Sequence, residues 1–138
     1  MTADGAGLPT ARDLGRESMA AVEAGDRATW LALFAEDAVV QDPVGPSAFD
    51  PEGHGHHGLE AIAAFYDNVI GANESIRFDI HQSYLCGDEV ANVGTIRIGF
   101  AGGGAVEVDG VYCYRRGTDG RLASLRAFWE PEQIRSVE

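Results

Sequence analysis

The chain has 138 residues, of which 45% are hydrophobic and 23% charged, and its formal net charge is −12 at pH 7. This length and composition predict one ordered globular domain over residues 1–138, with a core at about 10–130 and tails at 1–9 and 131–138. The negative charge argues against nucleic acid and anionic lipid as partners, because no basic cluster interrupts it. No apolar run approaches a membrane span, and residues 1–9 lack the pattern of a signal peptide, so we expect a cytoplasmic location.

Two helices are predicted at the start of the chain. Thr10 and Asp13 have the spacing of a capping box, and Gly25 supplies the stop for the helix that follows. Asp26 can cap a short second helix. The apolar or small side chains that we expect to face inward from this region are Leu14, Ser18, Ala21, Val22, Trp30, Leu31 and Phe34.

A strand with an acidic residue at its end comes next. Alternation carries Asp42 to the same side as Ala38 and Val40, which are apolar and face the core. Pro43 ends the strand, since it cannot donate a ladder hydrogen bond. The sequence therefore predicts a carboxylate at the rim of the core, where a general base could meet a buried ligand. The alternative is a strand-end carboxylate that accepts backbone N–H bonds or stays hydrated.

Residues 45–58 are rich in Gly, Pro and His and have no period, which predicts an irregular surface loop. His54, His56 and His57 lie near two acidic residues, so a metal site has to be considered. We expect no metal there, because flexible glycines do not hold ligands in fixed positions. A solvated loop, or a lid over a pocket mouth, is favoured instead. The sequence gives no reason to expect a cofactor.

The remainder predicts a third helix followed by four strands. The helix begins near Leu59, and its apolar face is expected to cover a sheet. Period-two alternation, divided by turns at 101–105 and 117–120, then predicts an antiparallel meander. The expected strands begin near Ile76 and then run roughly over 89–100, 106–114 and 121–129.

The third of these strands has two different faces. Val108, Gly110, Tyr112 and Tyr114 share one face, and Asp109 lies on the other. Helices first and strands later predict an α+β fold, in which a curved antiparallel sheet wraps around three N-terminal helices. Such a cone commonly holds a small apolar ligand with a few polar groups inside it.

Four parts of the chain resemble a known family. They are residues 25–45 with the run LALFAEDAVVQDPVG, residues 58–66, residues 110–115 and residues 120–129. In this order they resemble the bacterial ketosteroid isomerases of the nuclear-transport-factor-2-like, or SnoaL-like, superfamily. The resemblance spans about residues 10–130. It implies a cystatin-like α+β barrel, a steroid or similar apolar ring as ligand, and a homodimer.

The resemblance also implies roles for single residues. Asp42 matches the general base, which moves a proton between two carbons of a steroid enone through a dienolate. The family stabilises that oxyanion with a tyrosine on the first helix and a protonated aspartic acid on a later strand. Those positions carry Ser18 and Gly110 here. Asp109 would reach the inside only through a bulge or a register slip of one residue.

Tyrosines are the available substitutes for the two missing donors, because a phenol can donate to an enolate oxygen. We take Tyr112 as the candidate oxyanion donor, beside Asp42 as the candidate base. Tyr66 matches a tyrosine that supports the family's site, and Trp129 matches a pocket aromatic. The residues predicted to contact the ligand are Ser18, Phe34, Val40, Phe65, Tyr66, Gly110, Tyr114 and Trp129.

Three classes of function stay open, and we lean toward an enzyme. The first is an isomerase acting on a ketosteroid or a similar enone. The second is another enzyme on the same cone, such as a cyclase, a dehydratase or an epoxide hydrolase. Limonene-type epoxide opening needs an inward arginine, and Arg97 faces outward if Ile96 and Ile98 face the core. The third is a binding or assembly module without catalysis, for which the missing donors are positive evidence.

Overall fold

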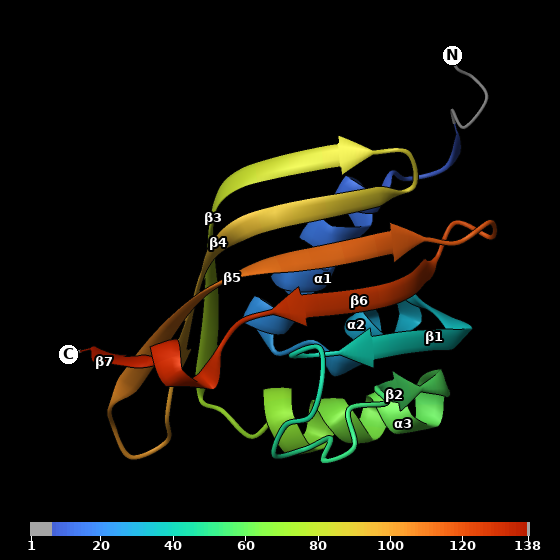
Figure 1. The fold of residues 1–138 in the computed structure, drawn as a ribbon. Coiled ribbons are helices and arrows are strands. Elements are labelled where there is room, and N and C mark those ends of the chain that lie inside the picture. The colour runs from blue at the N-terminus through green and yellow to red at the C-terminus, as the bar shows by residue number, and fades with distance from the viewer. Residues whose placement is uncertain (1–6, 138) are drawn as a thin grey trace.

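Helices precede the long strands along the chain, as predicted (Figure 1). The computed structural model describes residues 7–137, so most of the predicted tail at 1–9 and Glu138 lie outside the described residues. The helices are α1 (Ala11–Ala24), α2 (Arg27–Ala32) and α3 (Gly58–Phe65), followed by a π-helical turn at Tyr66–Ile70 and, near the C-terminus, a 3-10 turn at Pro131–Gln133. The strands are β1 (Phe34–Gln41), β2 (His56–His57), β3 (Ser75–Cys86), β4 (Glu89–Gly99), β5 (Ala105–Arg116), β6 (Leu122–Phe128) and β7 (Arg135–Val137).

One curved sheet has the strand order β2-β1-β6-β5-β4-β3, and β7 pairs with β5. Figure 1 shows the long strands β3, β4 and β5 bending past the helices, so the predicted α+β cone is confirmed. Strands β3 to β6 form the predicted antiparallel meander, but β1 joins β6 in parallel. The chain between β1 and β6 contains α3 and three long strands, which is long enough to bring it back in the same direction.

The predicted helix ends are also confirmed. The Thr10 side chain accepts from the backbone N–H of Asp13, and the Asp13 side chain accepts from that of Thr10. Gly25 ends α1 with a φ of 69°, a left-handed conformation that glycine adopts without steric strain. Asp26 caps α2 through the backbone N–H of Thr29. Local signals therefore define the two helices that form one wall of the core.

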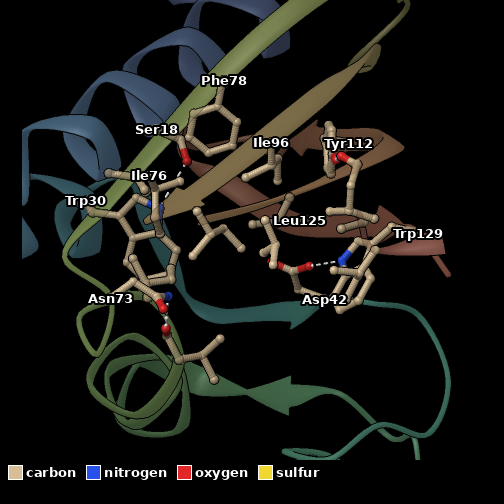
Figure 2. Close-up of a pocket in the computed structure, with 18 of the residues that line it drawn as sticks. Ser18, Trp30, Asp42, Asn73, Ile76, Phe78, Ile96, Tyr112, Leu125 and Trp129 are labelled. Atoms are coloured by element: carbon tan, nitrogen blue, oxygen red, sulfur yellow. Dashed lines mark hydrogen bonds between the residues drawn. The ribbon is translucent and has the colours of Figure 1, made fainter. Parts of the chain in front are cut away.

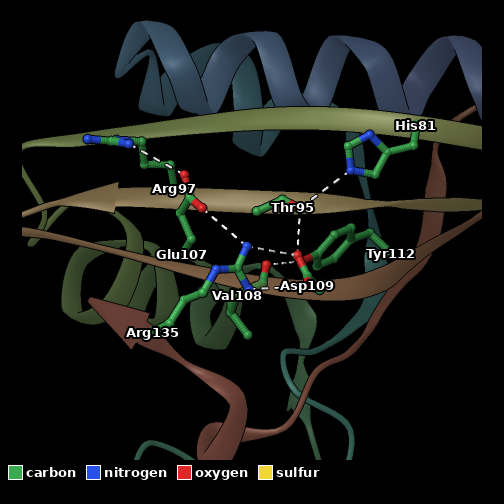
Figure 3. Close-up of polar contacts among 8 residues, drawn as sticks. All are labelled: His81, Thr95, Arg97, Glu107, Val108, Asp109, Tyr112 and Arg135. Atoms are coloured by element: carbon green, nitrogen blue, oxygen red, sulfur yellow. Dashed lines mark hydrogen bonds and ion pairs between the residues drawn. The ribbon is translucent and has the colours of Figure 1, made fainter. Parts of the chain in front are cut away.

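Asp109 lies on the outer face of the sheet. The pairing of β4 with β5 runs without a register shift from Glu89 opposite Arg115 to Gly99 opposite Ala105. The Asp109 carboxylate accepts a hydrogen bond from Thr95 Oγ1 at 2.6 Å and pairs with Arg135 at 3.2 Å (Figure 3). The register slip that would have brought this acid inside does not occur.

Arg97 also faces outward, as its alternation with Ile96 and Ile98 predicts. Its Nη1 lies 3.4 Å from Glu107 Oε2 on the neighbouring strand (Figure 3). The inward arginine that limonene-type epoxide opening would need is therefore not supplied by Arg97.

The C-terminal segment 131–138 differs from the predicted tail. It forms a 3-10 turn and then β7, whose Arg135 pairs with both Glu107 and Asp109 on β5. A three-residue strand that depends on ion pairs with a distant strand leaves no periodic signal in its own sequence. No helix within residues 7–137 combines the length and the apolar character that crossing a membrane requires.

Residues 45–58 are more ordered than predicted, because His56 and His57 form β2. They pair antiparallel with Val40 and Val39 of β1, and the His56 ring packs on Phe65 at 4.8 Å between centroids. Within residues 7–137, no group of three or more His, Cys, Asp or Glu side chains is arranged to hold a metal ion. The histidine-rich segment therefore extends the sheet.

Gly15 lets α1 approach the sheet closely. A Cβ atom at this position would lie 2.9 Å from Cδ1 of the Tyr114 ring on β5. Glycine inside a helix is less favourable than alanine by about 1 kcal/mol, and this contact is the reason for its presence here. Because Gly15 has no side chain, the Tyr114 ring fits between β5 and α1.

Replacing Gly15 by alanine tests this contact. The gain in helix propensity, about 1 kcal/mol, opposes an overpacking cost of about 1–3 kcal/mol. We expect the free energy of unfolding to fall by about 1 kcal/mol in chemical denaturation. The control Ala20→Gly, at an exposed position of the same helix, measures propensity alone. A Gly15→Ala variant more stable than the original protein would contradict the contact.

Candidate functional site

An apolar pocket lies between the inner face of the sheet and the helices (Figure 2). Most of the side chains that line it are apolar, which suits an apolar ligand. Side chains from α1, α2, the π-helical turn, strands β3 to β6 and the C-terminal segment line it. Its apolar walls include Val22, Ile76, Phe78, Ile96, Val108 and Leu125. None of residues 45–58 lines this pocket, so the lid predicted there does not cover it.

Asp42 directly follows β1, one residue beyond the end of the strand, and its carboxylate lines the pocket (Figure 2). Trp129 Nε1 donates a hydrogen bond of 2.6 Å to Asp42 Oδ1. Within residues 7–137 no donor bonds the second oxygen, Oδ2, which leaves it available to a ligand. Burial raises the pKa of Asp42, while the Trp129 bond and a charge on His56 oppose that rise. The result is a carboxylate with a raised proton affinity.

Tyr112 is buried on β5, and its hydroxyl occupies the space beside Gly110. A Cβ atom on Gly110 would lie 3.0 Å from that hydroxyl and 2.6 Å from the carbonyl oxygen of Phe128. Gly110 itself does not line the apolar pocket, so the structure differs from the prediction that it contacts a ligand. Burial, together with the nearby Asp42 charge, raises the pKa of Tyr112. Its hydroxyl therefore stays protonated, and it donates a long hydrogen bond of 3.4 Å to the Val108 carbonyl oxygen.

A second buried tyrosine reaches α1. Tyr114 Oη lies 3.4 Å from Ser18 Oγ, and Ser18 Oγ accepts a hydrogen bond of 3.0 Å from Trp30 Nε1. All three side chains line the pocket. Burial raises the pKa of Tyr114, and the Ser18 bond only partly opposes it. Ser18 is thus too short to span the pocket from α1, but it contacts a tyrosine hydroxyl that comes from the other wall.

Four residues predicted to contact a ligand lie behind the pocket wall instead. Trp30 packs against Phe34 at 4.7 Å and against Tyr66 at 5.4 Å between ring centroids, and it lies between them and the pocket. Val40 and Phe65 are buried where α3 packs on β1. These four predictions therefore need correction. Alternation identified the buried face correctly, but other side chains fill the space above it.

Sequence reasoning missed several residues that line the pocket or support it. Ile76, Phe78 and Ile96 line the pocket, and the period-two alternation of their strands could have added them to the expected ligand contacts. A glycine inside the helix was the available signal for Gly15. Asn73 lies in the turn before β3 and carries no periodic signal.

The arrangement suits one type of reaction. A partly buried carboxylate with a free oxygen can remove a proton from carbon, and neutral phenol hydroxyls can donate to the oxygen on which negative charge then develops. Asp42, Tyr112 and Tyr114 line one apolar pocket. The geometry is therefore compatible with proton abstraction next to a carbonyl group.

Comparison with known proteins gives consistent results. The X-ray structure of RV0760c from Mycobacterium tuberculosis is 34% identical, with a TM-score of 0.86 over 92% of this chain and 96% of that one. The same protein in complex with estradiol-17beta-hemisuccinate is 35% identical, with a TM-score of 0.84 over 91% and 97%. The Delta 5-3-ketosteroid isomerase from Mycobacterium sp. is 33% identical, with a TM-score of 0.86 over 92% and 98%.

A sequence search of curated proteins found no match. The family model of the SnoaL-like domain, in contrast, matches residues 16–125. This range begins in α1, ends in β6 and includes Asp42 and both pocket tyrosines. The chain therefore belongs to the SnoaL-like domain family of the nuclear-transport-factor-2-like superfamily.

Proposed function

We propose that this protein binds a steroid or a similar apolar ring ketone and isomerises it by allylic proton transfer, with Asp42 as the general base. The observation that carries the proposal is the Asp42 carboxylate, which is held by Trp129 and opens into an apolar pocket that two neutral tyrosines also line. Further support comes from the similarity to RV0760c, which has been crystallised with a steroid ester, and to a ketosteroid isomerase.

The proposed reaction converts a 5-ene-3-ketosteroid into the conjugated 4-ene-3-ketosteroid. Asp42 removes a proton from C4, and the electron pair of the broken C–H bond moves toward the ketone to form a dienolate. The carboxyl group then returns this proton to C6, so that Asp42 ends as a carboxylate again. Tyr112 exchanges its long bond to the Val108 carbonyl for a hydrogen bond to the dienolate oxygen. Burial favours both steps, because it raises the proton affinity of Asp42 and leaves Tyr112 protonated.

A non-catalytic steroid binder is the second candidate. It is favoured by the residues at the two usual donor positions, where Ser18 and Gly110 replace a tyrosine and an aspartic acid. Both candidates predict that the steroid binds, but only the first predicts turnover. Titration with a 4-ene-3-ketosteroid, followed by the fluorescence of Trp30 and Trp129 in the pocket wall, measures binding alone. Binding without turnover would support the second candidate, and absence of binding would contradict both.

The predicted homodimer and the predicted cytoplasmic location stay predictions of the sequence.

Replacing Asp42 by asparagine tests the base. Incubation with a 5-ene-3-ketosteroid is expected to raise the absorbance of the conjugated enone. We expect the variant to be slower by about 10²–10⁴-fold, because the amide cannot accept the proton. The control Asp37→Asn removes an exposed carboxylate from β1, the strand that leads to Asp42, and should retain the rate. Equal rates for Asp42→Asn and the unchanged protein would remove the isomerase proposal.

Replacing Trp129 by phenylalanine tests whether its hydrogen bond sets the pKa of Asp42. The indole bond lowers the pKa of Asp42 against the effect of burial, so its loss should raise that pKa further. The base works only when deprotonated, and the acidic limb of the kcat/KM profile should therefore move to higher pH. An unchanged limb, in a variant that still turns over, would show that this bond does not tune the base.

A further inference from the structure

Three polar groups from three different elements form a continuous chain in the pocket wall. The indole N–H of Trp30 on α2 donates to Ser18 Oγ on α1 at 3.0 Å, and Ser18 Oγ lies 3.4 Å from Tyr114 Oη on β5 (Figure 2 labels Trp30 and Ser18). The three residues are 0%, 1% and 3% exposed, in the order Trp30, Ser18, Tyr114. Each of them lines the apolar pocket.

The protons of this chain can be counted without knowing where each hydrogen lies. The indole N–H can only donate, so Ser18 Oγ must accept from it. The bond between Ser18 and Tyr114 then uses one of the two hydroxyl protons, whichever residue donates. Three donor protons are thus available, and the two hydrogen bonds use only two of them. One hydroxyl proton of the pair is left over in either arrangement.

The remaining proton has no acceptor among residues 7–137, because Ser18 and Tyr114 form no other side-chain hydrogen bond there. Buried donors are normally paired, so this one requires an acceptor that enters the pocket. Ionisation does not remove the surplus, since burial raises the pKa of Tyr114 above its ordinary value. The hydrogen-bonded side chains of Trp30, Ser18 and Tyr114 therefore present a neutral hydrogen-bond donor to the pocket interior.

The packing of α1 independently indicates that this position of Tyr114 is built into the fold. Gly15 lies one turn before Ser18, and a Cβ atom there would meet the Tyr114 ring at 2.9 Å. Two small residues on one face of α1 thus admit the ring and contact its hydroxyl. The tyrosine of β5 occupies space that a large side chain on α1 would otherwise fill.

We infer that the Trp30–Ser18–Tyr114 chain binds the carbonyl oxygen of the ligand, with the donated proton coming from the Ser18–Tyr114 pair. A ketone only accepts hydrogen bonds and so matches the surplus donor. A ligand hydroxyl could also accept, but it would bring another proton that needs its own acceptor. The site thus selects a ketone over the corresponding alcohol.

The inference deepens the proposed function and rests on it for its catalytic part. In the isomerisation, the same hydrogen bond would strengthen as the ketone becomes a dienolate, because charge-assisted bonds are stronger than neutral ones. The indole at the far end of the chain would polarise Ser18 and Tyr114 in the same direction. Trp30 and Ser18 are then positioning residues, and Tyr114 is a second donor beside Tyr112.

Isotope-edited infrared spectroscopy measures this hydrogen bond directly. The probe is a 4-ene-3-ketosteroid with ¹³C at C3 and no other carbonyl group, bound to the full-length protein. A hydrogen-bonded carbonyl vibrates at lower frequency than a free one. We expect a lowered C3 carbonyl frequency in the original protein, a smaller lowering in Ser18→Ala, and most of the lowering lost in Tyr114→Phe. Tyr84→Phe, which removes an exposed phenol from β3, should leave the frequency unchanged.

Affinity provides the second readout. Tyr114→Phe should weaken binding of the 3-ketosteroid about tenfold, the usual effect of one lost hydrogen bond. It should leave binding of the 3-deoxy analogue unchanged, and the 3-hydroxy analogue should bind more weakly than the ketone to the original protein. If Tyr114→Phe does not fold, Ser18→Ala keeps the comparison of ketone with 3-deoxy analogue available.

Failure of this inference can be told apart from failure of the proposed function. A carbonyl frequency that is the same in Tyr114→Phe, or that depends on Tyr112 alone, overturns the inference even if the protein isomerises its substrate. Equal weakening for the ketone and the 3-deoxy analogue also overturns it. A Tyr114-dependent frequency in a protein without turnover supports the carbonyl site and contradicts the isomerase. Absence of binding by every analogue overturns both.

Discussion

The hydrogen bond from Trp129 to Asp42 is the contact on which the site depends. It joins the end of β1 to the end of β6, which are neighbours because the two strands pair in parallel up to Gln41 opposite Arg126. The backbone N–H of Val44 also bonds the carbonyl oxygen of Ala127, so the chain stays beside β6 after the strand has ended. These contacts hold a carboxylate at the edge of an apolar pocket, where it would otherwise turn toward water.

The apolar surroundings raise the pKa of the acid and of the phenols, and both shifts suit proton transfer. Burial raises the pKa of Asp42, so the carboxylate becomes a stronger base. Burial also raises the pKa of Tyr112 and Tyr114, so both remain donors. Under the proposed isomerisation, two residues of β5 would take the role of the two usual donor side chains. Tyr112 takes the space beside Gly110, and Tyr114 takes the space beside Gly15 and Ser18.

Features that depend on neighbouring residues could be predicted from the sequence. The capping of α1 and α2, the inward direction of Asp42, and the division of β5 into an inner face with Tyr112 and an outer face with Asp109 all follow from short-range spacing. Alternation could not show which part of the buried face borders a cavity. For that reason Phe34 and Val40 were placed at the ligand, although Trp30 and α3 cover them.

Features that need distant segments in contact could not be predicted. The parallel pairing of β1 with β6, and the attachment of β7 through Arg135, depend on residues more than twenty positions apart. The chain of Trp30, Ser18 and Tyr114 brings together three elements whose individual patterns say only that each residue is inside. The missing first-helix tyrosine could be recognised in the sequence, whereas the tyrosine from the opposite wall required the folded structure.

Isotope transfer tests the central claim most directly, namely that one carboxyl group carries one proton between two carbons inside the pocket. The substrate is a 5-ene-3-ketosteroid deuterated at C4, the solvent is ordinary water, and mass spectrometry with NMR locates deuterium in the product. Because Asp42 returns the proton that it removes, deuterium is predicted at C6 in the original protein, and the Asp42→Asn variant should lose this transfer. Product that carries only solvent hydrogen at C6, or equal transfer in the variant, would contradict the account.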